Sequence, residues 1–345
     1  MKKIFLFIAL AIAISAQAQR DGEKPYLTKA FAGASISNVE VGTSGGGITL
    51  QGVDPSESRV EVYIQGNNRD LSREEIEERL KDYYDVTISL DGGKLYVKAK
   101  MKDGFHWSNS HSLNISFKVY APKSISSHLN TSGGGIDISH LAGGNQVFNT
   151  SGGGLEIADI QGNMDGNTSG GGIHVDHANG QNIHLTTSGG GIEANHCSGD
   201  ISLETSGGGL DLNNLDGTIR AHTSGGGIQG GHISGDLKTS TSGGSIDLQD
   251  LSCTLDASSS GGGIDVGMTA LGKSIRLGTS AGSIHLTLPA GKGMDLTLDA
   301  DGIETHNIGS FNGSQSKDHM DGSVNGGGIP VRLDASSGHI YLSCK

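Results

Sequence analysis

Hydrophobic and polar residues follow a fixed pattern after a recurring serine. Four and six residues after Ser132 stand Ile136 and Ile138, with the polar Asp137 between them. Alternation with period two predicts a strand with one buried face. The serine returns at intervals of 18 to 20 residues, at Ser132, Ser151, Ser169, Ser188, Ser206, Ser224, Ser242, Ser260 and Ser280. A self-similarity this regular predicts stacked structural units.

Two more apolar columns accompany this strand in each unit. The column nine residues after the serine holds Leu141, Ile160, Ala178, Cys197, Leu215, Ile233 and Leu251. A third column follows with Ile201/Leu203, Ile219/Ala221, Leu237 and Leu255. Glycine stands between them at Gly143, Gly162, Gly180, Gly199, Gly217 and Gly235. We therefore expect each unit to be one coil with three inward-facing sets, and with glycines at two corners to supply positive φ.

These columns favour one fold class. A single coil cannot bury its apolar row, but coils stacked about 4.8 Å apart form a continuous core. The pattern predicts an all-β protein, a right-handed parallel β-helix with about 18–19 residues per coil, since the hexapeptide period of the left-handed form is absent. The Thr-Ser pairs are expected to stack into hydroxyl ladders at one corner.

The chain divides into four predicted segments. Residues 1–18 have the charged start, short apolar run and small residues of a signal peptide, so we expect export to the periplasm, the cell surface or the medium. Residues 19–125 hold an early repeat copy and one α-helix, with Ser72 and Glu75 as a capping box, and are expected to cap the stack. Residues 126–287 form the regular coils. Residues 288–345 form irregular coils, with a half-copy at 335–342 that closes the stack.

Composition narrows the classes of partner. The 345 residues include 58 glycines, 4% aromatics and a formal net charge of −13, which argues against binding nucleic acid. No later stretch is apolar for long enough to insert into a membrane. Cys197 and Cys253 are expected to be small packed residues, about three coils apart and too distant for a disulfide.

Matches to known chemical motifs are weak. Residues 267–274 fit the P-loop pattern, but Ile275 and Leu277 then alternate as a strand where phosphate binding needs a helix. The glycine-rich corners differ from calcium-binding nonapeptides by a serine in the first slot. His174, His177 and His184 lack further ligands at a recognisable spacing. We predict no catalytic, cofactor or metal site and no enzyme activity.

The most informative surface position lies five residues after each serine, between two inward residues. Its acidic members are Asp137, Glu156, Glu193, Asp211, Asp247 and Asp265, and His174, Gln229 and His285 interrupt them. Two interpretations stay open. The column is either a solvated face that discourages sheet association, or a cation or ligand face that binds Ca²⁺ weakly between paired carboxylates.

Several motifs together resemble one family. They are the serial Thr-Ser-Gly-Gly-Gly-Ile-Asp-Ile units, Gly-Asp-Ile at 199–201, Asn-Gly-Gly-Gly-Ile-Pro-Val-Arg-Leu at 325–333 and Ser-Gly-His-Ile at 337–340. Over residues 31–345 the chain resembles the bacterial putative-adhesin family of glycine-rich β-strand-repeat proteins, a domain of unknown function in cell-envelope proteins of the Bacteroidetes type. The resemblance implies a right-handed β-helix in the cell envelope and adhesion, and it supplies no catalytic residues.

We accordingly expect an exported, non-enzymatic adhesin whose partner is a surface ligand such as a glycan or a host or matrix protein. A purely structural envelope protein and a polysaccharide-acting enzyme are the alternatives. In the loop before the strand that begins near Ser112, Phe105, His106 and Trp107 are candidates for ligand contact or for packing in the N-terminal cap.

Overall fold

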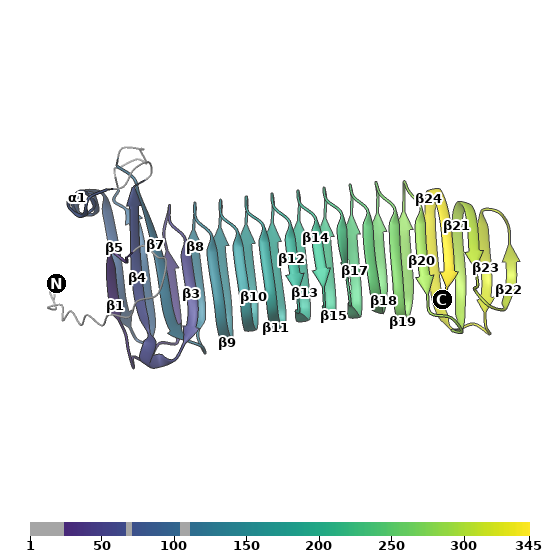
Figure 1. Cartoon of the computed structure of the whole chain (residues 1–345), viewed down its shortest axis with the longest axis horizontal. Coiled ribbons are helices and arrows are strands. Elements are labelled where there is room, and N and C mark those ends of the chain that lie inside the picture. The colour runs from purple at the N-terminus through teal and green to yellow at the C-terminus, as the bar shows by residue number, and fades with distance from the viewer. Residues whose placement is uncertain (1–23, 67–70, 104–110) are drawn as a thin grey trace.

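The computed structural model describes residues 24–66, 71–103 and 111–345. The predicted signal peptide and the aromatic turn at Phe105 and Trp107 lie outside these residues. Within them the protein is all-β apart from helix α1 (Arg73–Tyr83) and one turn of 3-10 helix (Pro55–Glu57). The strands form an elongated stack of coils, with α1 near one end (Figure 1).

Successive interior coils pair in parallel along the stack. Their strands are β9 (Ile136–Thr150), β10 (Leu155–Thr168), β11 (Ile173–Thr187), β12 (Ile192–Asn195), β13 (Ser198–Thr205), β14 (Leu210–Asn213), β15 (Asp216–Thr223), β16 (Ile228–Gly231), β17 (Ser234–Thr241), β18 (Ile246–Ser259), β19 (Ile264–Thr279) and β20 (Ile284–Leu288). Leu155 pairs with Ile136 on one side and with Ile173 on the other, as the repeat interval predicts.

The three apolar columns form the core. Ile138, Leu141 and Phe148 of one coil are each 0–1% exposed, and the equivalent residues of the following coils are also buried. The prediction of three inward-facing sets per coil is confirmed. Cys197 and Cys253 are buried and unbridged, also as predicted, and burial raises the pKa of their thiols to about 11 and about 12.

Glycine has two different roles at the corners. In the column that includes Gly143 and Gly199 the glycines adopt positive φ, as predicted, with the exception of Gly180. The Ser-Gly-Gly-Gly corner does not: in the regular coils its glycines keep negative φ, so that part of the prediction is wrong. A Cβ on the middle glycine would instead lie 2.2–2.4 Å from the carbonyl oxygen of the middle glycine in the preceding coil. Glycine is needed there because the backbones of adjacent coils approach too closely for a side chain.

The threonine before each corner fixes this close approach. Thr205 Oγ1 donates to the carbonyl of Gly190 in the preceding coil (2.6 Å) and accepts from the amide of Gly208 in its own coil (3.3 Å). The same two bonds recur from Thr131 to Ser259. The expected ladder of Thr and Ser hydroxyls is therefore wrong, because the threonines are buried and bond to backbone whereas the serines are exposed.

The N-terminal end has strands out of chain order. β2 (Asn38–Gly42) lies between β6 (Lys94–Met101) and β8 (Ser126–Thr131), and β3 (Ile48–Val53) lies between β7 (Leu113–Pro122) and β9, all in parallel. β4 (Arg59–Gly66) and β5 (Tyr84–Asp91) add on the outside in antiparallel sense, and β1 (Leu27–Ala30) pairs with β4. Helix α1 starts at the predicted capping box, with Ser72 Oγ bonded to the Glu75 amide (3.2 Å) and Glu75 bonded back to Ser72 (3.0 Å).

At the C-terminal end, too, the strands do not pair in the order in which they follow one another in the chain. β24 (Ile329–Cys344) pairs in parallel with β19 and β20 on one side and with β21 (Met294–His306) on the other. β23 (His319–Val324) then pairs with β21, and β22 (Phe311–Gln315) with β23, both antiparallel. The expectation that the half-copy at 335–342 closes the stack is wrong: it lies inside the stack, and the antiparallel strands form the end.

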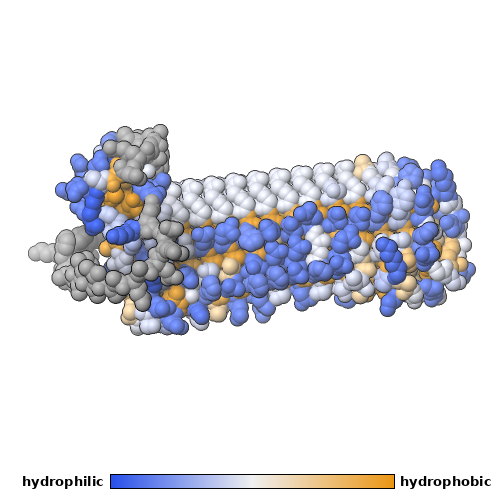
Figure 2. All heavy atoms as spheres, in the orientation of Figure 1, coloured by the Kyte–Doolittle hydropathy of each residue, from blue (hydrophilic) through white to orange (hydrophobic). Residues whose placement is uncertain are grey.

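The surface of the stack is banded (Figure 2). A neutral band runs along the coil corners, a hydrophilic face lies beside it, and a hydrophobic stripe separates the two. No helix among the described residues has both the length and the apolar character needed to cross a bilayer.

Candidate functional site

The acidic column predicted from the sequence is a continuous row across the coils. The register of the parallel strands places Glu193 beside His174 and Asp211, and places Asp247 beside Gln229 and Asp265. The acidic side chains among these lie between two buried residues of their strands, as Glu193 does between Ile192 and Ala194. The predicted pairs Asp137/Glu156, Glu193/Asp211 and Asp247/Asp265 are neighbours in adjacent coils.

Neutral donors accompany the paired carboxylates. Asn195 Nδ2 donates to Glu193 (3.0 Å), Gln229 Nε2 to Asp211 (3.0 Å), and Gln249 Nε2 to Asp247 and Asp265 (3.1 and 3.2 Å). His174 Nδ1 lies 3.3 Å from Glu193 Oε2. These contacts reduce the repulsion between stacked carboxylates, and two of the donors occupy interrupting positions of the column itself.

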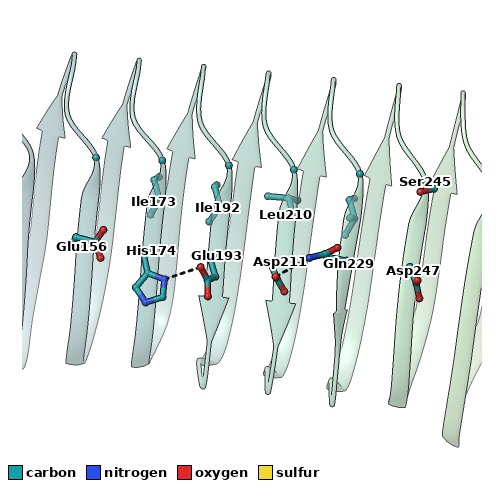
Figure 3. Close-up of a pocket in the computed structure, with 16 residues that line it drawn as sticks. Glu156, Ile173, His174, Ile192, Glu193, Leu210, Asp211, Gln229, Ser245 and Asp247 are labelled. Carbon is teal, nitrogen blue, oxygen red and sulfur yellow. Dashed lines mark hydrogen bonds and ion pairs between the residues drawn. The ribbon is translucent and has the colours of Figure 1, made fainter.

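A shallow groove of about 760 Å³ follows this column across six coils. Figure 3 shows the row Glu156, His174, Glu193, Asp211, Gln229 and Asp247 along one side of it. The other side is the last glycine of each corner, from Gly154 to Gly227, with Ser245 at one end. The groove exists because a glycine, or Ser245 in one coil, stands beside an outward-pointing polar side chain in each of these coils.

A second hollow, of about 340 Å³, begins one coil further toward the N-terminus. It is lined by Asp137 and Gly135 of the repeat and by Tyr63 and Lys118 of the N-terminal end. Lys118 Nζ lies 4.9 Å from the centre of the Tyr63 ring, and Tyr63 Oη donates to Glu61 (2.8 Å). Burial and this hydrogen bond raise the pKa of the Tyr63 phenol, so it remains a neutral donor.

The structure tests the sequence interpretation of this face in part. The outward position of the column five residues after each serine is confirmed, and the groove beside it was not foreseen. The offset of seven residues from each serine, which places Asn195, Asn213 and Gln249 next to the acids, was available in the sequence as a signal. Tyr63 and Lys118 had no such signal, because they come from strands outside the repeat. Weak Ca²⁺ binding by the paired carboxylates stays a prediction.

The P-loop match lies within β19, a continuous strand, so the segment has no helix to face a phosphate.

A second outward column lies eight residues after the serines from Ser132 to Ser242. It holds His140, Asp159, His177, His196, Asn214, His232 and Asp250, and all seven have φ between 52° and 58°. This left-handed conformation is one that His, Asp and Asn adopt more readily than most residues. Among the described residues, a single group of three side chains has metal-ligand atoms close together: Asp176, His177 and His196, within 4.8 Å of one another.

Comparison with known proteins gives little beyond this. No protein-family model matches the chain, and no curated protein matches it. A putative cell adhesion protein from Clostridium sporogenes is 10% identical, with a TM-score of 0.21, over 92% of this chain and 98% of that one. A putative lipid binding protein from Parabacteroides distasonis is 15% identical, with a TM-score of 0.29, over 91% and 95%. A putative adhesin from Bacteroides fragilis is 11% identical, with a TM-score of 0.25, over 92% and 96%. TM-scores this low give the likeness no weight for fold or function.

Proposed function

We propose that this protein is an exported, non-enzymatic adhesin that binds an extended polymer along its acidic groove. The observation that carries the proposal is the groove itself, which repeats the same glycine edge and polar row over six coils. A ligand made of repeating units matches such a periodic surface better than a compact small molecule does. The acidic row favours a neutral or positively charged chain, such as a neutral glycan or a basic stretch of a matrix protein, and disfavours polyanions.

Other observations support adhesion without catalysis. The carboxylates of the row are exposed or half-buried and take amide donors, whereas catalytic acids are usually held in enclosed sites. The repeat motifs resemble the putative-adhesin family, and residues 1–18 have the pattern of a signal peptide.

We infer that the coils wind in the right-handed sense. Each coil returns to the same sheet in parallel, and parallel crossover connections are right-handed in about 98% of cases. The absence of a hexapeptide repeat agrees with this. A crystal structure with left-handed coils would overturn the assignment.

The test is a binding screen of residues 19–345 against glycans and matrix proteins, with and without Ca²⁺. Binding should be lost in the groove variant Glu193→Gln/Asp211→Asn. The matched control is Glu204→Gln/Asp165→Asn, which removes the same charge from exposed positions of β13 and β10 that do not line the groove. Equal loss in both variants would show a general charge effect and would contradict a role for the groove. Silence across the screen would favour the alternative, a structural envelope protein.

A further inference from the structure

We propose that Asp176, His177 and His196 form a binding site for a divalent transition-metal ion, with Zn²⁺ as the expected occupant. The site is separate from the acidic groove and belongs to the second outward column. His177 and His196 occupy the same register position in adjacent coils, and Asp176 precedes His177 on strand β11. Two imidazoles and one carboxylate are ligands that Zn²⁺ accepts, typically with a water in the fourth position.

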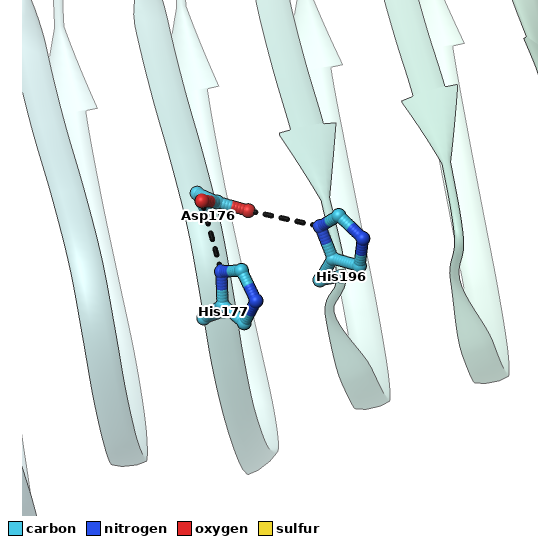
Figure 4. Close-up of side chains that lie close together, drawn as sticks. All are labelled: Asp176, His177 and His196. Carbon is cyan, nitrogen blue, oxygen red and sulfur yellow. Dashed lines mark hydrogen bonds and ion pairs between the residues drawn. The ribbon is translucent and has the colours of Figure 1, made fainter.

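The carboxylate lies between both rings (Figure 4). His177 Nδ1 is 2.9 Å from Asp176 Oδ2, and His196 Nδ1 is 3.1 Å from Asp176 Oδ1. The two imidazoles stack with centroids 4.6 Å apart and planes inclined by 14°, and both direct Nδ1 toward the carboxylate. Bonds of about 2.0–2.1 Å in a tetrahedral site hold ligand atoms about 3.3 Å apart, so these separations are close to those that an ion needs.

The backbone positions the two histidines before any ion arrives. Both have left-handed φ, at 53° and 52°, and both stand beside ladders that fix adjacent coils. An ion bound at Nδ1 replaces the shared hydrogen bond, and each neutral ring then carries its proton on Nε2.

The other coils show why this pair is distinct. His140 faces Asp159 (3.4 Å) and His232 faces Asp250 (3.8 Å), so each of those pairs offers one imidazole. The position before the turn is a carboxylate only at Asp176, whereas the neighbouring coils have Ala158 and Asn195 there. Of the described coils, this is the one place where histidines in two consecutive coils, His177 and His196, lie next to an acidic residue, Asp176.

The test uses the metal alone with the full mature chain. Titration calorimetry with Zn²⁺ should give one ion per chain, and Co²⁺ should give the visible absorption of a tetrahedral site with nitrogen and oxygen ligands. The variants His177→Asn, His196→Asn and Asp176→Asn put at each position a residue found natively in the same column, at Asn214 and Asn195. They should therefore fold, which their unfolding midpoints without metal will verify.

Each variant should weaken Zn²⁺ binding roughly 100-fold or more, since loss even of an outer-shell partner costs 10–100-fold. The control His140→Asn removes an equivalent histidine from a pair that offers one imidazole, and it should leave the affinity unchanged. If the wild-type protein binds no Zn²⁺, or if His177→Asn, His196→Asn and Asp176→Asn all retain the wild-type affinity, the site does not exist. Weakening by His140→Asn alone would place the ion elsewhere and would also overturn the proposal.

Discussion

The interior coils and the two ends of the stack are built on different rules. An interior coil pairs with the coils that immediately precede and follow it in the chain, as β15 does with β13 and β17. At the ends, β2 lies between β6 and β8, and β24 lies between β19 and β21. Antiparallel strands then cover both ends, which stops the addition of further parallel strands. Coils that pair in chain order extend the stack, whereas strands that pair out of chain order, with antiparallel strands outside them, terminate it.

Deletions of similar length should separate the two rules most clearly. Removing residues 206–223 takes out one repeat and joins Thr205 to Ser224, which restores the Thr-Ser corner, so we expect a folded protein with a slightly lower unfolding temperature. Removing residues 329–345 takes away the strand that pairs with β19, β20 and β21, so buried residues such as Leu277 and Ile284 lose their cover. We expect aggregation, measured by light scattering after size-exclusion chromatography. Similar behaviour of the two deletions would refute the comparison.

The close approach of coils at the Ser-Gly-Gly-Gly corner predicts the next largest effect. A Cβ on Gly171 would lie 2.3 Å from the carbonyl oxygen of Gly153, so Gly171→Ala should cost about 3 kcal/mol in denaturant unfolding. A Cβ on the adjacent Gly172 meets its nearest atom at 3.2 Å, and Ser245 occupies the equivalent position natively. Gly172→Ser should therefore cost less than about 1 kcal/mol. Equal costs would show that the close approach is not the reason for the glycine.

The buried hydroxyl at the same corner gives a smaller effect. Thr205→Val removes the donor to the Gly190 carbonyl and the acceptor of the Gly208 amide, so we expect a loss of about 1–3 kcal/mol. Thr205→Ser is the control, because Ser259 makes both bonds natively (2.7 and 2.9 Å). A valine variant as stable as the serine variant would argue against the hydroxyl bridge.

Replacing a glutamate by glutamine should have the smallest effect on the free energy of unfolding, and the effect should be opposite in sign at the N-terminal end and in the interior. Hydrogen bonds from Lys94 and Lys98 across β2 and β6 lower the pKa of Glu40 to about 2. Its stabilisation is therefore full above the ordinary glutamate pKa, about 4.3, and is lost as pH falls toward 2. Glu40→Gln should cost up to about 1 kcal/mol at pH 7, progressively less as the pH falls toward 2, and nothing once the pH is well below 2.

Glu156→Gln is the interior counterpart. It removes a charge directly opposite Asp137, so it should raise the free energy of unfolding by roughly 0.2–1 kcal/mol. Thermal unfolding of both variants from pH 7 to pH 2 checks the pair. A destabilised Glu156→Gln would mean that the stacked carboxylates hold a stabilising ion, and the addition of Ca²⁺ would then raise the wild-type midpoint.

The interior coils could be predicted from sequence because each contact repeats at a constant interval. Leu155 pairs with Ile173 for the same reason that Leu210 pairs with Ile228, and the acidic column follows from the same register. The order of the strands at the ends could not be predicted. Ile284 pairs with Ile340, and the residues between them do not follow the repeat interval. Glycine was ambiguous, because positive φ and close backbone approach both select it. The left-handed turn at His177 and His196 had a usable signal, a column of only His, Asp and Asn.

The position of β24 also sets the order in which the chain can assemble. An interior coil needs only the coil before it, so folding can follow synthesis one repeat at a time. β21 lacks its inner neighbour until β24, which is made after it, enters between β21 and β19. Residues 294–324 therefore gain their full set of hydrogen bonds last. The C-terminal end should be the slowest part of the protein to become protected from amide hydrogen exchange, and β24 and β21 should open together.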